Sequence, residues 1–252
     1  MAALLGQALY AAATAAWNTW ARDRALRDAP GFAEAWEITN NIPGWLSEVN
    51  AAVFWGVIAE VRPKSVVEIG SYLGKSTTLL ALGVRHLSRA GATVSAIDPH
   101  TGDRQHLEAL NVATLPSLEL FRQHIEGAGV GDVVEEHVAT SDEVAQTWAK
   151  TIDLLYIDGW HSYDAVRRDA ANFASKLSPN GVVCFDDYAY YDEVRQAADD
   201  ACAELGLISY GATTMQAWAG RSERPPQSVA RVRQLSSLIH AVRDRSAWIR
   251  SK

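Results

Sequence analysis

The chain has 252 residues, enough for one large domain or for one domain with helical additions. Its 48% hydrophobic share is ordinary for a globular protein, and its formal net charge of -7 argues against nucleic acid as the main partner, because phosphate binding needs a basic surface. Two cysteines, Cys184 and Cys202, give neither a disulfide framework nor a zinc motif, which favours a reducing cytoplasmic location.

The first twenty residues carry no charged side chain. They are rich in alanine and interrupted by polar residues, so the pattern is weak as a membrane span, and no basic leader of a secretory signal precedes it. We expect an amphipathic helix as far as Asp28, followed by a second helix from Ser47 to Val61, where apolar residues recur at helical spacing. Residues 1–62 would then form N-terminal helices that contact an acceptor or another subunit.

From residue 63 to residue 220, patterns typical of strands alternate with patterns typical of helices. The predicted strands cover 65–69, 93–97, 133–138, 154–157 and 182–185, with a final strand pair within 207–219. The predicted helices cover 76–89, 116–127, 142–149, 163–177 and 193–205. This alternation predicts an α/β domain with a doubly wound, mainly parallel, seven-stranded Rossmann-like sheet.

The composition becomes basic from Arg221 to Lys252, where eight basic residues stand against two acidic ones. After Pro225 and Pro226, apolar residues recur at helical spacing from Val229 to Val242. We expect residues 221–252 to form a basic helix. Docking on the domain or on a second subunit, in a homodimer, is favoured over a membrane-surface role.

Two of the predicted strands end in carboxylates. One run reads LLYIDGWH and ends at Asp158, with His161 three residues later, and the other reads GVVCFDDY and ends at Asp186 and Asp187. The carboxyl ends of parallel strands are where open α/β sheets bind ligands, so these side chains are expected to converge. Carboxylate oxygens suit Mg²⁺, and an imidazole suits proton abstraction. The alternative is that the acids cap helices or stay solvated, and that His161 bonds to backbone.

The turn after the first predicted strand carries two glycines, Gly70 and Gly74. These allow close backbone approach, and the helix that follows offers free amides to a polar or anionic group. The spacing fits neither the GxGxxG of nicotinamide dehydrogenases nor a phosphate-binding P-loop. Asp98 ends the second predicted strand, where an acid can accept both hydroxyls of a ribose or can cap a helix.

Together these motifs resemble the class I S-adenosylmethionine (SAM) methyltransferases. More narrowly, they resemble the metal-dependent catechol-type O-methyltransferases and their relatives that methylate sugar hydroxyls. The resemblance spans about residues 48–188, and the motifs that carry it are ExGxYxGxS at 68–76, Asp98, ATSD at 139–142, DGWH at 158–161 and DD at 186–187.

The resemblance implies a role for each motif residue in binding SAM or a cation. The implied SAM contacts are Gly70 and Ser71 along the methionine part, Ser76 at its carboxylate, Asp98 at the ribose, and Ser141 and Asp142 by the adenine. Further implied cofactor-site residues are Glu68, Tyr72, Gly74 and Asp158. The implied ligands of Mg²⁺, or of another divalent cation, are Asp158, Asp186 and Asp187.

Two departures from the catechol pattern point to the sugar branch. Asp187 stands where the catechol enzymes have Asn, and His161, the predicted catalytic base, stands where they have Lys. Aromatic side chains that pack against sugars or phenols lie nearby in sequence: Trp36, Trp45, Trp160, Tyr188, Tyr190 and Tyr191. We therefore expect an enzyme that methylates a sugar or oligosaccharide acceptor. The size, the DGWH and DDY motifs and the basic C-terminus are also similar to enzymes acting at position 1 of methylmannose oligosaccharides.

Two other functions remain open from the sequence. An O-methyltransferase of a phenolic or other small metabolite would use the same cofactor with a different acceptor. A nicotinamide oxidoreductase, or a catalytically silent nucleotide-binding module, would share only the fold.

Overall fold

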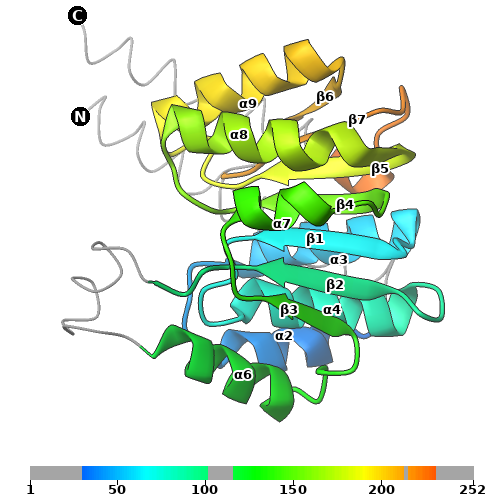
Figure 1. Ribbon diagram of the computed structural model, residues 1–252. Coiled ribbons are helices and arrows are strands. Elements are labelled where there is room, and N and C mark those ends of the chain that lie inside the picture. Colours follow the sequence, from blue (N-terminus) through cyan, green and yellow to red (C-terminus); the bar gives the residue numbers. More distant parts are fainter. Residues whose placement is uncertain (1–29, 102–115, 213–214, 231–252) are drawn as a thin grey trace, which may run out of the picture.

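The computed structural model describes residues 30–101, 116–212 and 215–230. Seven strands form one sheet in the order β3-β2-β1-β4-β5-β7-β6 (Figure 1). Strands β1 to β5 are parallel, and β7 runs antiparallel between β5 and β6. The predicted fold class, a doubly wound and mainly parallel seven-stranded sheet with flanking helices, is confirmed.

The elements alternate along the chain much as the sequence predicts. The strands are β1 (Ser65–Ile69), β2 (Thr93–Ile97), β3 (Val134–His137), β4 (Ile152–Ile157), β5 (Leu177–Phe185), β6 (Ile208–Ala212) and β7 (Ala217–Gly220). The helices are α2 (Phe32–Asn40), α3 (Glu48–Val61), α4 (Lys75–Leu87), α6 (Ser117–Gly127), α7 (Ser141–Thr147), α8 (Tyr163–Phe173) and α9 (Asp192–Leu205). In the described part of the chain, no helix is long and apolar enough to span a bilayer.

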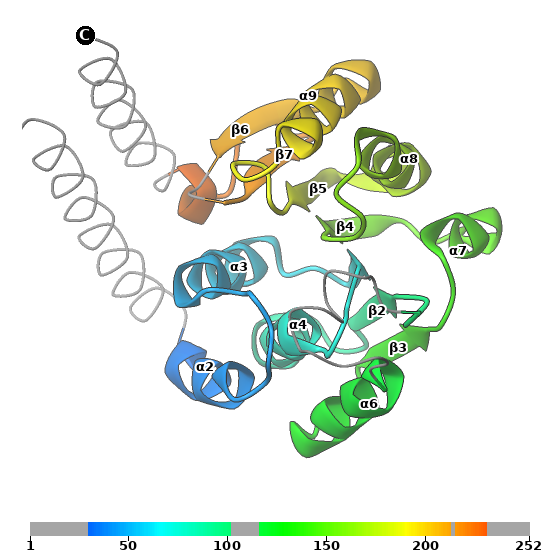
Figure 2. The same ribbon diagram turned by 90° about the vertical axis from the view of Figure 1, so that its left-hand side faces the viewer.

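Helices cover both faces of the sheet (Figure 2). On one face, α2, α3, α4 and α6 enclose a core that includes Trp55, Phe54 and Phe121, and on the other α7, α8 and α9 cover a core that includes Phe173 and Phe185. Helix α3 is nearly apolar all round, as expected for a helix enclosed between the sheet and other elements. The two cores fix the sheet between them and leave its carboxyl edge to build a site.

Three differences from the sequence expectation exceed two residues. Helix α2 was not predicted, because proline and glycine residues close to both of its ends read as breaks. The helix expected over 163–177 ends at Phe173 and continues as a 3₁₀ turn, Ala174–Lys176. Strand β5 begins at Leu177, which pairs with Ile152, rather than at residue 182. The predicted helices over 1–28 and over most of 221–252 lie outside the described residues.

The register of the parallel strands aligns their carboxyl ends in one row. Ile97, Ile69, Ile157 and Phe185 are neighbours across β2, β1, β4 and β5. The residues that follow them extend the ladder by one step, since the amides of Gly70, Asp158 and Asp186 donate to Ile97, Ile69 and Ile157. Asp98, Gly70, Asp158 and Asp186 therefore stand side by side at this edge.

Candidate functional site

The glycine turn after β1 is held by the carboxylate of Asp98. Asp98 Oδ2 accepts hydrogen bonds from the amides of Ser71 and Tyr72 at 2.9 and 2.8 Å, and its Oδ1 accepts one from the amide of His100 at 2.7 Å. Tyr72 and His100 both adopt left-handed backbone conformations, which non-glycine residues rarely do. Asp98 thus shapes the turn with the same oxygens that the resemblance assigns to a ribose.

Gly70 is required by its neighbour on β4. It has a φ of 89°, and an added Cβ would lie 2.1 Å from the carbonyl oxygen of Asp158. That atom is backbone and cannot move aside cheaply, so only glycine fits. The close backbone approach predicted for this glycine is real, and in the structure it joins the glycine turn to the first acidic strand end.

Glu68 lies beneath the glycine turn and is completely buried. Thr77 Oγ1 donates to its Oε2 at 2.5 Å. Burial raises the pKa of Glu68 to about 7, against the effect of hydrogen bonds from Ser76 and Thr77. Glu68 and Ser76, both predicted to serve the cofactor, therefore lie together at the start of α4, with their side chains directed to each other.

The turn also offers polar groups to a ligand. Ser71 Oγ is buried and meets no hydrogen-bond partner among the described residues. Gly74 precedes α4 in a left-handed conformation, so the first turn of that helix presents its amides close to Ser71. An orphaned hydroxyl beside helix amides fits the polar amino-acid end of a cofactor.

A loop between α2 and α3 lies over the glycine turn. The ring of Trp45 stacks on Tyr72 with centroids 5.8 Å apart, and Lys75 Nζ donates to the carbonyl of Gly44 at 3.3 Å. The same ammonium group sits over the ring of Trp36 at 5.6 Å. This loop therefore forms one wall of the site.

Ser141 and Asp142 begin α7, and their side chains contact residues of α8. Ser141 Oγ donates to the buried carboxylate of Asp169 at 2.5 Å, and Asp142 accepts from Asn172 and pairs with Arg168. Burial raises the pKa of Asp169 to about 6. Sequence reasoning missed Asp169, whose only signal was its place on the inner face of the predicted helix.

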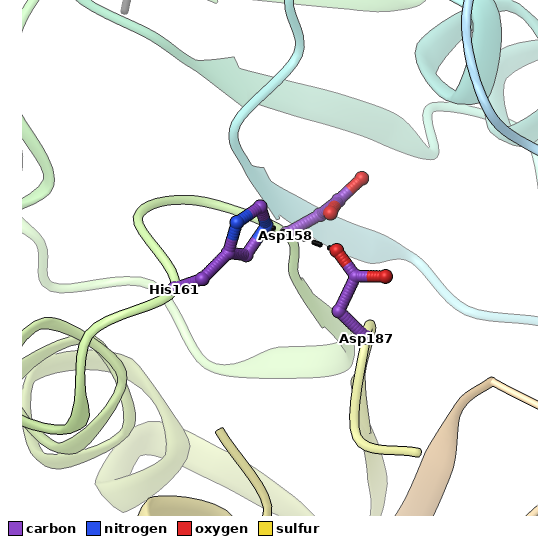
Figure 3. A group of neighbouring side chains, drawn as sticks. All are labelled: Asp158, His161 and Asp187. Carbon is purple, nitrogen blue, oxygen red and sulfur yellow. Dashed lines mark ion pairs between the residues drawn. The ribbon is translucent and has the colours of Figure 1, made fainter. Parts of the chain in front are cut away.

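Asp158, His161 and Asp187 form the acidic cluster (Figure 3). One ligand atom from each lies within 4.8 Å of the others, a spacing that suits a shared cation. His161 Nε2 lies 3.0 Å from Asp187 Oδ2, and Tyr191 stacks on the imidazole at 4.7 Å with nearly parallel rings. Asp187 has a φ of 53°, a strained conformation that occurs here at the predicted site.

Asp186 is the predicted metal ligand that lies outside this close group. Its Oδ2 accepts a hydrogen bond from the hydroxyl of Tyr156 at 2.5 Å, and the same hydroxyl lies 3.0 Å from Asp158 Oδ2. The predicted convergence of three acids and His161 is therefore observed as three close residues, with Asp186 joined to them through Tyr156.

Like charges crowd this end of the sheet. Burial, together with the charges of Asp186 and Asp187, raises the pKa of Asp158 well above its usual range. Burial and the charge of Asp187 also raise the pKa of Asp186, against hydrogen bonds that lower it. A divalent cation would relieve this repulsion, so the donor set fits such an ion.

The aromatic residues predicted to line the mouth divide into two groups. Trp45, Trp160 and Tyr190 are exposed by 69, 61 and 71%, respectively. Tyr188, by contrast, donates its hydroxyl to Asp199, and Trp36 stacks on Phe32. Tyr191 stacks on His161, so the three exposed rings are the ones with most surface left for a ligand, although Trp45 also stacks on Tyr72.

A family model described as a methyltransferase domain matches residues 67–188. This stretch runs from β1 to the residues just after β5. It contains the glycine turn, Asp98 and the whole acidic cluster.

Solved structures share the fold. A SAH-bound methyltransferase, PaMTH1, from Podospora anserina is 17% identical, with a TM-score of 0.55 over 80% of this chain and 93% of that chain. The O-methyltransferase TomG from Streptomyces achromogenes, involved in tomaymycin synthesis and solved with SAM, is 15% identical, with a TM-score of 0.53 over 75% and 88%. A putative caffeoyl-CoA O-methyltransferase from Staphylococcus aureus is 13% identical, with a TM-score of 0.57 over 80% and 97%.

The family match and the arrangement of the site agree on one assignment. The residues that the family model matches are those that build the glycine turn, its carboxylate anchor and the acidic strand ends. Residues 67–188 match a methyltransferase domain, and the chain has the fold of the O-methyltransferase structures named above.

Proposed function

We propose that this protein is a SAM- and Mg²⁺-dependent O-methyltransferase that methylates a sugar hydroxyl of a glycan or glycoside. The observation that carries the proposal is the acidic cluster of Asp158, His161 and Asp187. It stands at the ends of β4 and β5, beside the glycine turn of a methyltransferase domain. A cation-and-base site next to a cofactor turn is what methylation of a weakly acidic hydroxyl needs.

The glycine turn and its surroundings would hold SAM. Ser71 and the first amides of α4 suit the charged amino-acid end, with Gly70, Tyr72, Gly74 and Ser76 around it. Asp98 keeps the turn in shape through its three amide contacts, and its Oδ1, which accepts only one of them, has a lone pair left for a ribose hydroxyl. Glu68 supports the turn from beneath.

The acidic strand ends would hold the cation. Asp158 and Asp187 offer carboxylate oxygens within reach of one ion, and Asp186 contributes charge from the adjacent position. Such an ion, when bound, lowers the proton affinity of a coordinated hydroxyl and fixes its oxygen. The charge of three carboxylates favours a divalent ion over a monovalent one.

His161 would be the catalytic base. In the tautomer in which Nε2–H donates to Asp187, the ring is oriented and Nδ1 is left to accept the hydroxyl proton. The imidazolium that forms is stabilised by the Asp187 carboxylate and by the face of Tyr191. His161 would thereby take the proton as the hydroxyl oxygen attacks the methyl carbon of SAM, so that a C–O bond forms, the C–S bond breaks and S-adenosylhomocysteine leaves.

The exposed rings of Trp45, Trp160 and Tyr190 support a sugar acceptor, because aromatic faces pack against the CH-rich faces of sugars. The same faces would accept a phenol, so a phenolic or other small-metabolite acceptor is the second candidate. The resemblance to the sugar branch, through His161 and Asp187, favours the glycan. Position 1 of a methylmannose oligosaccharide is the narrowest form of the proposal.

The rest of the chain would support this domain. We assign catalysis to residues 63–220, acceptor and subunit contacts to residues 1–62, and homodimer contacts to the basic segment 221–252. The two free cysteines accord with a cytoplasmic enzyme.

Transfer of labelled methyl from SAM to a panel of oligosaccharides, glycosides and phenols tests the acceptor. The proposal expects label in the glycan or glycoside acceptors. Transfer confined to phenols would replace the sugar by the second candidate. Calorimetry should show binding of SAM and none of NAD, and the reverse result would reject methyl transfer.

A further inference from the structure

The residue beneath the acidic cluster is a tyrosine that the roles assigned above do not use. The side chain of Tyr156, in β4, is almost fully buried, and its hydroxyl reaches two of the three acids. It lies 2.5 Å from Asp186 Oδ2 and 3.0 Å from Asp158 Oδ2. One hydroxyl proton is thus shared between carboxylates on two neighbouring strands.

The strand geometry explains this position. Tyr156 and Asp158 are two residues apart along β4, so both side chains point to the same face of the sheet. Tyr156 pairs with Cys184 in β5, which places Asp186 two residues further on, diagonally across the ladder. A side chain as long as tyrosine reaches the diagonal neighbour, whereas a shorter one would not.

Packing holds the phenol ring in place. Phe54 from α3 meets it edge to face, with centroids 4.7 Å apart, and Trp218 from β7 packs on Phe54 in turn. The ring belongs to the core between the sheet and α3. A hydroxyl on so constrained a ring fixes the carboxylates that it contacts more firmly than a surface side chain could.

We propose that Tyr156 is a positioning residue for the cation site, acting through Asp186 and Asp158. The contact directs Asp186 Oδ2 to the Tyr156 hydroxyl, inside the protein. The oxygens that face the ion would then come from Asp158 and Asp187. The second contact of the same hydroxyl, with Asp158 Oδ2, fixes the rotamer of Asp158. This inference rests on the proposed function, because it assumes that the acidic cluster binds a divalent cation.

The test compares Mn²⁺ binding to the full-length wild-type protein and to Tyr156→Phe, by calorimetry without acceptor or turnover. Loss of a partner that orients metal ligands costs about 10- to 100-fold in metal affinity, and we expect a loss in this range. SAM affinity should stay within about twofold, because the hydroxyl that is removed bonds to Asp158 and Asp186, at the ends of β4 and β5.

Tyr210→Phe is the matched control. Tyr210 is equally buried, and its hydroxyl donates to the carbonyl of Ser222 at 2.7 Å, which is not part of the cluster. Both variants should lower the thermal midpoint, but only Tyr156→Phe should weaken Mn²⁺ binding. Equal Mn²⁺ affinity in wild type and Tyr156→Phe would overturn the inference and leave the proposed function standing. A wild-type protein that binds no Mn²⁺ would overturn both.

A double-mutant cycle with Asp186→Asn tests the route from Tyr156 to the cation, and every variant is measured below its thermal midpoint, so that lost Mn²⁺ binding is not lost folding. Asp186→Asn retains an oxygen for the tyrosine but removes the carboxylate through which Tyr156 acts. If the tyrosine works through Asp186, the double variant should bind Mn²⁺ little more weakly than Asp186→Asn alone. Fully additive losses would contradict the route through Asp186 and leave only the contact with Asp158.

Discussion

The acidic side chains in the two halves of the sheet's carboxyl edge have different surroundings. At β1 and β2, Glu68 and Asp98 are met by donors of the chain itself, from a threonine hydroxyl to three backbone amides. At β4 and β5, Asp158 and Asp187 stand close together, and burial and like charge raise the pKa of Asp158. The first half builds the scaffold of the glycine turn, although Glu68 Oε1 meets no hydrogen-bond partner among the described residues, whereas the second half gathers charge that suits a ligand.

This difference separates two uses of buried carboxylates. An acid whose hydrogen bonds close within the protein stabilises a turn and shapes a pocket. Acids that repel one another at a pocket mark a place where a cation or a proton is expected. The variants below test whether the two halves differ in this way.

The largest effect is expected from Asp158→Ala. Without this carboxylate the cation loses a ligand, and several kcal/mol of transition-state stabilisation should disappear, so kcat/KM should fall by about 10³-fold or more. Labelled methyl transfer measures the loss. Asp153→Ala is the control on the same strand, since that carboxylate accepts from the amides of Lys64 and Ser65 at the opposite edge. Near wild-type turnover in Asp158→Ala would sink the proposed site.

His161→Ala should lower kcat by about 10²- to 10⁴-fold, the range of general-base catalysis. If His161 is the base, Mn²⁺ affinity should change by less than about threefold, because Asp158 and Asp187 remain. A fall in Mn²⁺ affinity that parallels the fall in kcat would make the imidazole a cation ligand instead. The two measurements together therefore assign its role.

Glu68→Gln tests the β1 side of the comparison through the pH dependence of the free energy of unfolding. The folded state raises the pKa of Glu68 from 4.5 to about 7, so its contribution to stability is full below pH 4.5 and is lost as pH rises through 7. In urea unfolding, the free-energy difference between wild type and Glu68→Gln should shift by about 3 kcal/mol between pH 4 and pH 8, with the variant favoured at the higher pH. Parallel curves for the two proteins would show that Glu68 is not a buried acid of this kind.

The smallest effect is expected from Trp45→Ala. Losing one exposed aromatic face should raise the acceptor KM by about 3- to 10-fold, matching 0.5–1.5 kcal/mol per ring contact, with kcat little changed. Ile38→Ala removes another exposed apolar side chain, from α2, and should leave the acceptor KM unchanged. An unaltered KM in Trp45→Ala would remove this ring from the acceptor site.

The sequence predicts which residues lie at the carboxyl edge of the sheet better than it predicts the side-chain contacts that these residues make. Buried runs such as Leu154–Ile157 are recognisable because parallel strands are apolar on both faces, and the acids that follow them then fall into one row. The side-chain contacts depend on rotamers and on strand register, and the two-residue alternation of a strand specifies neither. Tyr156 read as one more apolar strand residue, and Asp169 as one more acid on a helix, although both contact residues of the predicted site.

The left-handed turn at Asp187 is another feature that sequence patterns do not reveal. Two consecutive acids at a strand end would point to opposite faces if the strand continued. The positive φ of Asp187 ends the strand and accompanies a contact with His161, while Asp186 contacts Tyr156. Predicting that bend requires the packing of β5 against its neighbours.

Removal and return of the cation in the wild-type protein tests the central claim most directly. With labelled SAM and a responsive acceptor, EDTA should abolish methyl transfer while SAM still binds by calorimetry, and added Mg²⁺ should restore turnover. That result would show that the scaffold half binds its ligand independently while the acidic half depends on an ion. Full turnover in EDTA would contradict the account, because the acids of β4 and β5 would then act without a cation.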